Sequence, residues 1–324
     1  MAEPAIAVRG LRKRFGDVVA LDGVDFEVPP ASVFGLLGPN GAGKTTVVRV
    51  LTTILRPDTG EASVLGLDVA DEPARVRARI GLAGQFAAVD GNLTGRENLR
   101  LIGRLTHLPR RMIEDRAAEL LDQFDLADAA DRPARTYSGG MRRRLDLCAA
   151  LVHRPPVLFL DEPTTGLDLY SRKQLWAVIE NLQSEGTTLL LTTQYLEEAD
   201  YLAEDIVVID RGQVIAQGTP AHLKSRIGGT VIDIGLADPG EARRAQSVVA
   251  KFACRPPEAS GSEVRFEVTD GARVLVDALR VLDGEGLAPA TIAVREPSLD
   301  DVFLALTGRR VEPEETTEDA RGAA

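Results

Sequence analysis

Cysteine, histidine and long apolar runs are all scarce in this 324-residue sequence. The two cysteines, Cys148 and Cys254, lack metal-ligand spacing, and the three histidines are scattered, so no zinc-type pattern forms. No apolar stretch approaches the ~20 residues that a membrane-spanning helix needs. The first residues lack the basic and apolar blocks of a signal peptide. These absences fit a protein of the reducing cytoplasm that has no spanning helix of its own.

Acidic residues outnumber basic ones: the sequence has 49 aspartates and glutamates and 38 lysines and arginines, which gives a net charge of −11. Neutralising the phosphates of a nucleic acid needs a basic surface, so we expect no nucleic-acid partner. The densest basic cluster near a motif is Arg142-Arg143-Arg144, which we interpret as a solvated helix face. The 44% apolar and 27% charged composition is that of an ordinary globular protein. The length allows one large domain with an appendage, or two domains.

One glycine-rich stretch has the context of a phosphate-binding loop. It reads Gly38-Pro39-Asn40-Gly41-Ala42-Gly43-Lys44-Thr45-Thr46. It follows a predicted buried strand at 33–37 and opens a predicted helix. Glycines let backbone N–H groups converge on a phosphate, and the helix N-terminus adds partial positive charge. Lys44 can then reach the β- and γ-phosphates, and the Thr45 hydroxyl can ligate Mg²⁺. A strand–helix turn with an incidental Lys-Thr would not match at every fixed position, so the sequence predicts a nucleoside-triphosphate site.

Two acids follow a second predicted buried strand, at 157–160. Ligand sites of parallel sheets lie at the carboxyl ends of the strands, so Asp161 and Glu162 are expected near the triphosphate. There one carboxylate can hold Mg²⁺ and the other can position water. The alternative is that the acids merely end the strand. Two acids after a buried strand, in a chain that also has a phosphate loop, disfavour that alternative.

Several further motifs are ambiguous when taken singly. Phe15, expected between strands at 5–9 and 24–28, could stack on a base, but an exposed Phe before a turn looks the same. Tyr137-Ser138-Gly139-Gly140-Met141 could be an anion-binding helix start or a plain Ser N-cap. Residues 90–150 form a helical insertion in an otherwise alternating strand-and-helix pattern. A capping box at Thr94 begins one helix, and residues 110–124 form another.

Together and in order, these motifs resemble those of the ATP-binding subunit of ABC transporters over about residues 4–225. The resemblance implies an α/β P-loop NTPase cassette with a mixed-sheet core, an antiparallel β subdomain and the helical insertion. It implies ATP and Mg²⁺ as ligands. The ATP-binding residues would be Phe15, Gly38, Pro39, Asn40, Gly41, Ala42, Gly43, Lys44, Thr45, Thr46 and Gln85.

The resemblance also assigns roles beyond the phosphate loop. The magnesium ligands would be Thr45, Gln85 and Asp161, and the catalytic residues would be Glu162 as base, Gln194 and Lys44. The ATP held by an opposite subunit would be contacted by Ser138, Gly139, Gly140 and Asp168. In that family the subunits form a head-to-tail pair, either two copies or two different ATPase chains.

Three positions depart from the wider family pattern. Tyr137 and Met141 replace the usual leucine and glutamine of the signature motif, and Gln194 replaces the switch histidine. With segments 84–86, 93–99, 193–200 and 296–304, these features resemble the daunorubicin/doxorubicin-resistance type of ATP-binding subunit.

Composition shifts after about residue 227, so we expect domains at 1–227 and 228–310. The second is a small α+β unit with predicted strands at 231–236, 264–268 and 290–294 and helices at 242–252, 272–282 and 299–306. Its role is contact with another subunit or simple stabilisation. Residues 311–324 are polar and mostly acidic, and are expected to be disordered.

The sequence therefore predicts an ATP-hydrolysing subunit of a drug-type exporter. It would sit at the cytoplasmic face of the cell membrane, bound to a separate transmembrane permease that carries the cargo. One rival is an ABC ATPase acting on ribosomes or DNA, but the single cassette and acidic balance disfavour it. A regulatory module without hydrolysis is disfavoured by intact Lys44, Asp161 and Glu162, and a GTPase by the lack of an Asn-Lys-x-Asp motif.

Overall fold

The computed structural model describes residues 3–84, 89–226, 228–269 and 271–307. Gln85 and the predicted acidic tail at 311–324 lie outside these residues. The chain divides into two compact units, the first ending at Pro220 and the second beginning at Ala221. Each unit is described by itself.

A mixed sheet forms the centre of the first unit, with the strand order β10-β9-β3-β8-β7-β6. Its strands are β3 (Val33–Leu37), β6 (Ile80–Ala83), β7 (Val157–Asp161), β8 (Thr188–Thr193), β9 (Asp205–Asp210) and β10 (Gln213–Gly218). All neighbours pair in parallel except β9 and β10, which form an antiparallel hairpin. Every residue of β3, β7 and β8 is buried, because these apolar runs are covered on both faces. The predicted buried strands are thus confirmed, and their carboxyl ends meet at one edge.

An antiparallel sheet lies beside this core, with the order β2-β1-β4-β5. It contains β1 (Ile6–Phe15), β2 (Val18–Val28), β4 (Thr59–Val64) and β5 (Leu67–Asp68). The prediction that residues 12–16 lie between strands was wrong, because β1 continues to Phe15. Register shifts between Val8 and Arg14 break the period-two pattern, so the second half of the strand does not alternate in sequence.

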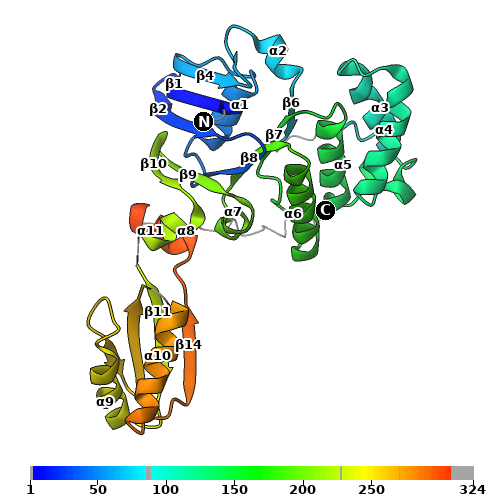
Figure 1. The fold of residues 1–324 in the computed structure, drawn as a ribbon. Helices are drawn as coiled ribbons and strands as arrows, with labels where there is room; N and C mark the ends of the chain where they lie inside the picture. The colour runs from blue at the N-terminus through cyan, green and yellow to red at the C-terminus, as the bar shows by residue number, and fades with distance from the viewer. Residues whose placement is uncertain (1–2, 85–88, 227, 270, 308–324) are drawn as a thin grey trace, which may run out of the picture. The chain divides into compact units, whose positions relative to one another are not determined.

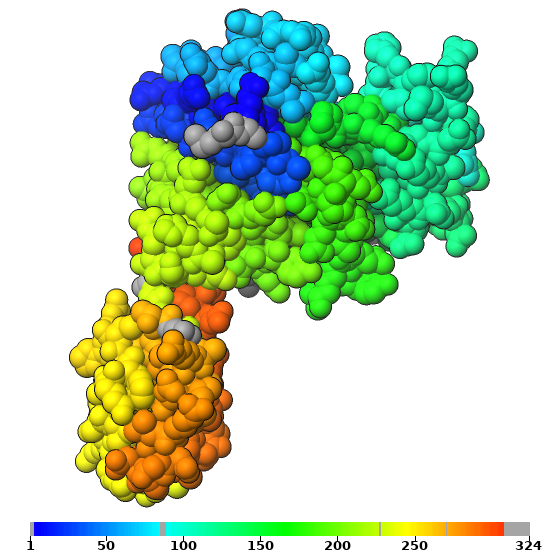
Figure 2. Space-filling model, in the orientation of Figure 1, coloured from blue at the N-terminus to red at the C-terminus, as the bar shows by residue number. Residues whose placement is uncertain are grey.

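The helices around the two sheets build the rest of the first unit. They are α1 (Lys44–Leu51), α2 (Pro73–Arg77), α3 (Gly95–Leu105), α4 (Arg110–Gln123), α5 (Gly139–Leu151), α6 (Leu169–Ser184) and α7 (Leu196–Leu202), with the 3-10 turns Ala127–Ala129 and Ala134–Thr136. The predicted capping box at Thr94 is present. Helices α3 and α4 stand as a lobe at the margin of this unit (teal in Figures 1 and 2). Helix α5 lies between that lobe and the mixed sheet.

Two apolar clusters hold the first unit together. One, which includes Phe34, Val47 and Ile209, fills the space between the antiparallel sheet, α1 and the mixed sheet. The other, which includes Leu120, Leu145 and Leu191, joins the helical lobe, α5 and α6 to the mixed sheet. Because α5 belongs to this second cluster, its N-terminal end is fixed relative to the ends of the strands.

The second unit is an antiparallel sheet of order β12-β13-β11-β14 with its own apolar core. Its elements are α8 (Pro220–Ser225), β11 (Thr230–Gly235), α9 (Pro239–Val249), β12 (Glu258–Ser260), β13 (Glu263–Val268), α10 (Gly271–Gly284), β14 (Thr291–Arg295) and α11 (Leu299–Thr307). The predicted α+β pattern is confirmed, with two elements added. Strand β12 is fully exposed and α8 is short, so neither gives a periodic apolar signal.

No helix among the described residues is both long enough and apolar enough to cross a membrane.

Candidate functional site

The glycine-rich stretch joins β3 to α1, as the sequence predicted. Gly43, directly before α1, has φ 112°, a conformation that side chains rarely adopt. A Cβ at Gly43 would also lie 2.7 Å from the carbonyl oxygen of Ala20, so the loop needs glycine here for space as well as for conformation. The first turn of α1 carries no acid, and its partial positive charge is left available to an anion.

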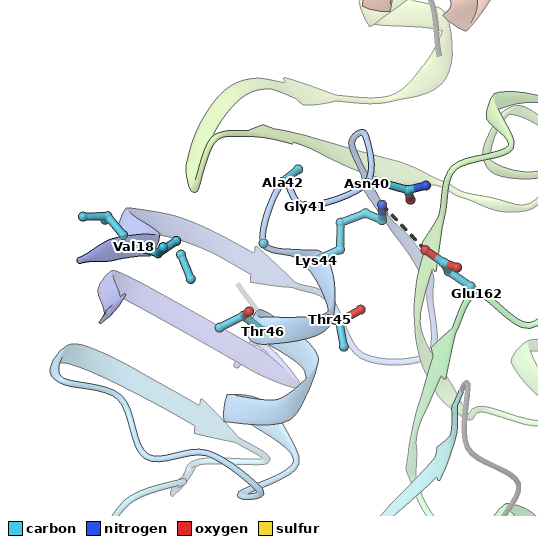
Figure 3. A pocket seen from close by; sticks show the side chains of 11 residues that line it. Val18, Asn40, Gly41, Ala42, Lys44, Thr45, Thr46 and Glu162 are labelled. Carbon is cyan, nitrogen blue, oxygen red and sulfur yellow. Dashed lines mark ion pairs between the residues drawn. The ribbon is translucent and has the colours of Figure 1, made fainter. Parts of the chain in front are cut away.

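A pocket of about 240 Å³ opens over this loop (Figure 3). Its lining residues are Val18, Val19, Ala20, Asn40, Gly41, Ala42, Gly43, Lys44, Thr45, Thr46 and Glu162. Seven of the eleven belong to the predicted phosphate loop, and Glu162 directly follows β7, far from the loop along the chain. The fold therefore brings together the loop and an acid that the sequence marked separately.

Lys44 is at the centre of the pocket, and its side chain is only 4% exposed. Its ammonium group donates to the carbonyl oxygens of Gly38, at 2.8 Å, and Pro39, at 3.1 Å. It also pairs with Glu162 Oε1 at 3.8 Å, the contact dashed in Figure 3. Burial lowers the pKa of Lys44, and the charges of Glu162 and Asp161 oppose that shift. The Lys44 ammonium group thus lies beside two acids at the phosphate loop.

Asp161 is the last residue of β7 and accepts hydrogen bonds from two hydroxyl groups. Thr192 Oγ1 donates to Asp161 Oδ1 at 2.6 Å, and Thr45 Oγ1 donates to the same oxygen at 3.3 Å. A hydroxyl and a carboxylate side by side are the hard oxygen ligands that Mg²⁺ prefers. The donor set of Thr45 and Asp161 therefore fits this ion. The third predicted ligand, Gln85, lies outside the described residues.

Glu162 adopts the left-handed conformation, with φ 52°. Its N–H donates to both the carbonyl and the hydroxyl oxygen of Thr192, each at 3.1 Å. A bulky residue with positive φ costs on the order of 1–3 kcal/mol, and such strain is typical of functional sites. Its side chain is 9% exposed and faces Lys44 in the pocket, so a carboxylate is held at the phosphate loop.

The aromatic predicted to stack on a base, Phe15, does not line this pocket as the described residues define it, but its strand partner Val18 does. Phe15 ends β1, is 46% exposed, and pairs with Val18 across the β1–β2 hairpin. Val18 and Val19, which are 65% and 43% exposed, line the pocket but were not predicted. The signal that the sequence offered for them was a pair of adjacent valines directly after Gly16-Asp17.

Gln194 directly follows β8 and is 5% exposed. Within the described part of the chain it does not line the pocket. Glu198, four residues later on α7, was not predicted as a site residue and is fully buried. It accepts hydrogen bonds from Thr164 Oγ1 at 3.1 Å and Trp176 Nε1 at 3.2 Å. Burial raises the pKa of Glu198. This carboxyl group thus links the loop after β7, helix α6 and helix α7.

Ser138, Gly139 and Asp168 lie on the surface of the chain. Ser138 Oγ accepts from the Met141 N–H at 3.2 Å and caps α5, and Asp168 caps α6 in the same way through Ser171. A Cβ at Gly140 would lie 3.3 Å from Ser171 Oγ, so the two caps are neighbours, whereas a Cβ at Gly139 would meet nothing within 4 Å. None of these residues lines the pocket over the phosphate loop, as far as the described residues define it.

Tyr137, which departs from the family pattern, is buried and anchors the start of α5. Its hydroxyl donates to the Ala129 carbonyl oxygen at 2.7 Å. A Cβ at Gly95 would lie 2.4 Å from that hydroxyl oxygen. The Tyr137 side chain therefore ties the signature loop to the helical lobe at a point where α3 must carry a glycine.

The interpretation of Arg142–Arg144 as a solvated face was wrong for Arg143 and Arg144. Arg142 is exposed, but the Arg143 and Arg144 side chains are only 14% and 24% exposed. Arg144 donates to the Phe124 carbonyl oxygen, and Arg143 donates to several carbonyl groups at the strand ends. The sequence pattern could not reveal this because the acceptors are main-chain atoms from other elements.

Comparison with known proteins agrees with this geometry. The ABC transporter family model matches residues 21–165, and the model of the "ATP-binding protein DrrA1-3-like, C-terminal domain" matches residues 218–307. The cassette also superposes on a solved "ATP binding subunit of ABC transporter", with a TM-score of 0.63 and 27% identity. That match covers 68% of this chain and 92% of the other.

Two curated relatives match along nearly the whole chain. The "Daunorubicin resistance ATP-binding protein DrrA2" of Streptomyces coeruleorubidus is 54% identical, over 98% of this chain and 99% of the relative. The "Daunorubicin/doxorubicin resistance ATP-binding protein DrrA" of Streptomyces peucetius is 48% identical, over 98% and 96%. The chain therefore belongs to the family of ABC-transporter ATP-binding proteins, in its daunorubicin/doxorubicin-resistance type.

Proposed function

We propose that this chain hydrolyses ATP to drive export of a drug-like compound through a separate transmembrane permease. The observation that carries the proposal is the meeting of Lys44, the phosphate loop and Glu162 in one pocket. The names of the relatives, which refer to daunorubicin and doxorubicin resistance, support the cargo class. Attachment to a permease would place the chain at the cytoplasmic face of the cell membrane.

The phosphate loop and Lys44 bind the triphosphate in this proposal. Backbone N–H groups from Gly38 to Thr46 and the start of α1 attract the phosphate oxygens. Lys44 exchanges its bonds to the Gly38 and Pro39 carbonyl groups for bonds to phosphate, and stabilises the charge that develops during transfer. Phe15 and the neighbouring Val18 contact the base.

Glu162 acts as the general base. Its carboxylate accepts a proton from the attacking water, and its buried position beside Lys44 orients it toward the phosphate loop. Mg²⁺, held by Thr45 and Asp161 together with Gln85, would supply further stabilisation of negative charge on the phosphate oxygens. Gln194 contacts the terminal phosphate through its amide.

The exposed caps at Ser138–Gly140 and Asp168 serve the nucleotide of a second ATPase subunit, which is another copy or a paired chain. Their exposure and their absence from this chain's own pocket, among the described residues, support a role across a dimer interface. The second unit, at about 228–310, is proposed to contact a subunit of the transporter.

Phosphate release by the purified chain with Mg²⁺ and ATP tests the proposal. We expect turnover in the wild type and a loss of about 10²- to 10⁴-fold in Glu162→Gln, because the amide cannot accept the water's proton. Glu162→Gln should still bind ATP and accumulate an ATP-dependent dimer in size-exclusion chromatography. A wild type that binds ATP without hydrolysing it would instead indicate a regulatory module.

A further inference from the structure

Arg143 holds the main chain at the ends of two strands of the mixed sheet. Its guanidinium donates to the carbonyl oxygens of Pro163 at 2.8 Å, Glu162 at 2.8 Å and Asp161 at 3.2 Å. It also donates to the carbonyl oxygen of Gly84, directly after β6. Four acceptors from two segments thus converge on one side chain that is 14% exposed.

Three of these carbonyl groups belong to consecutive residues, Asp161, Glu162 and Pro163. They include the two acids of the site, and the middle residue has the strained φ of 52°. The Glu162 N–H is held from the other side by Thr192. The peptide groups on both sides of the Glu162 Cα are therefore held, which fixes the direction of its Cα–Cβ bond and so the point from which the carboxylate reaches Lys44.

No other side-chain type provides this set of bonds. Arginine presents five donors in a rigid planar fork, whereas lysine offers one ammonium group and cannot span the four acceptors. Burial lowers the pKa of Arg143, and the nearby charges of Asp146 and Asp161 counteract that shift. A guanidinium is not deprotonated in proteins, so Arg143 is a charged donor, and hydrogen bonds from a charged group are the stronger ones.

Arg143 lies on α5, one turn after Ser138, Gly139 and Gly140. The same helix therefore carries the cap that would contact the nucleotide of the opposite subunit and the side chain that fixes Glu162. A shift of α5 by a fraction of an ångström would change the hydrogen bonds at Asp161, Glu162 and Pro163.

We propose that Arg143 is a positioning residue that aligns Glu162 for catalysis and couples that alignment to helix α5. The inference rests on the proposed ATPase function. Arg143 itself does not line the pocket, within the described residues, and its bonds to this region go to main-chain carbonyl groups, so it acts through the backbone of Glu162.

The test compares Arg143→Lys with Arg144→Lys, because Arg144 is the next residue on α5 and also donates to a carbonyl oxygen, that of Phe124. For Arg143→Lys we expect kcat to fall about 10- to 100-fold, since a small misplacement of a catalytic group has an effect of that size. The KM for ATP should stay within about twofold, because the loop and Lys44 are untouched. Arg144→Lys should keep kcat within about twofold.

A double-mutant cycle separates positioning from general stability. In the Glu162→Gln background, single-turnover hydrolysis should be no slower when Arg143→Lys is added, because the base through which Arg143 acts is already absent. Equal losses in both backgrounds, or a wild-type kcat in folded Arg143→Lys, would overturn the inference. The thermal midpoint of each variant shows whether it is folded. A wild type without hydrolysis would instead reject the proposed function, so the two failures are distinguishable.

Discussion

The two halves of the proposed ATP site differ in how complete they are within a single chain. Lys44, Asp161 and Glu162 are buried; Lys44 pairs with Glu162, and Asp161 accepts from the hydroxyl groups of Thr45 and Thr192. Ser138, Gly139 and Asp168 are exposed, and their hydrogen bonds serve only to cap their own helices. The first half is held together by contacts within the chain, whereas the second presents a surface. This difference is expected if binding requires one chain and hydrolysis requires two.

Within the buried half, Lys44→Ala should have the largest effect on ATP binding. It removes the buried cation, and a hydrogen bond to a charged group contributes ~1.5–3 kcal/mol, so ATP affinity should fall roughly 10- to 100-fold. Equilibrium binding of a fluorescent ATP analogue measures this. Unchanged affinity would contradict the assignment of the phosphate loop.

Gly139→Asp tests the exposed half with little risk to folding, since Gly139 is exposed and a Cβ there meets nothing within 4 Å. ATP affinity and thermal midpoint of the single chain should be unchanged. Turnover should fall at least about tenfold, because a carboxylate would face the phosphates of the opposite subunit.

In the Glu162→Gln background, Gly139→Asp should also abolish the ATP-dependent dimer. A dimer that persists would show that Gly139 is not at the interface, and the contrast between the two halves would disappear.

Gln194 has a smaller expected effect, because its amide can offer only an uncharged hydrogen bond. Gln194→Ala should lower kcat by about 3- to 10-fold, the value of one such bond. Gln194→His should keep much of the activity and acquire an acid-side titration near pH ~6.5 that the wild type lacks. Full activity in Gln194→Ala would show that this buried residue only ends β8.

Glu198→Gln concerns stability and should have the smallest effect. Because burial raises the pKa of this carboxyl above the ordinary value of 4.5, its stabilising contribution is complete below that pH and is lost as the pH rises through the raised pKa. The uncharged amide avoids that loss.

The thermal midpoint of Glu198→Gln should therefore exceed that of the wild type by about 2–4 °C at pH 8, a difference that disappears below pH ~4.5. Calorimetry at the two pH values measures it, with Glu197→Gln as the matched control on the exposed side of the same helix. If Glu198→Gln raised the thermal midpoint equally at both pH values, burial of a charged carboxylate would be rejected as the cause of the difference.

The sequence predicted the buried strands and the phosphate loop because their signals are local. An apolar run such as 157–160 is long enough to identify a strand with both faces covered, and the turn after 33–37 matched at every fixed position. The capping box at Thr94 is likewise defined by residues three apart. Residue type and strand order predicted Asp161 and Glu162 near the triphosphate; in the structure Glu162 lies 3.8 Å from Lys44 of the phosphate loop.

What the sequence could not predict depends on contacts between distant segments. Arg143 looks like any arginine on a charged helix, since the carbonyl groups that it bonds carry no sequence signature. In the sequence Glu198 looks like an exposed acid, because its hydrogen-bond donors Trp176 and Thr164 come close to it only in the folded chain. The second half of β1 was missed because its register shifts interrupt the alternation on which the prediction depends.

The contact between Tyr137 and Gly95 sets the order in which this protein can change over evolution. The Tyr137 hydroxyl occupies the space that a Cβ at residue 95 would need, 2.4 Å away. Gly95→Ala therefore requires the Tyr137 side chain to shift or to be shorter, whereas Tyr137→Leu makes no clash at residue 95 and loses the bond to Ala129. Once residue 137 were a leucine, a side chain at residue 95 would have more room, and a return to tyrosine would restore the conflict.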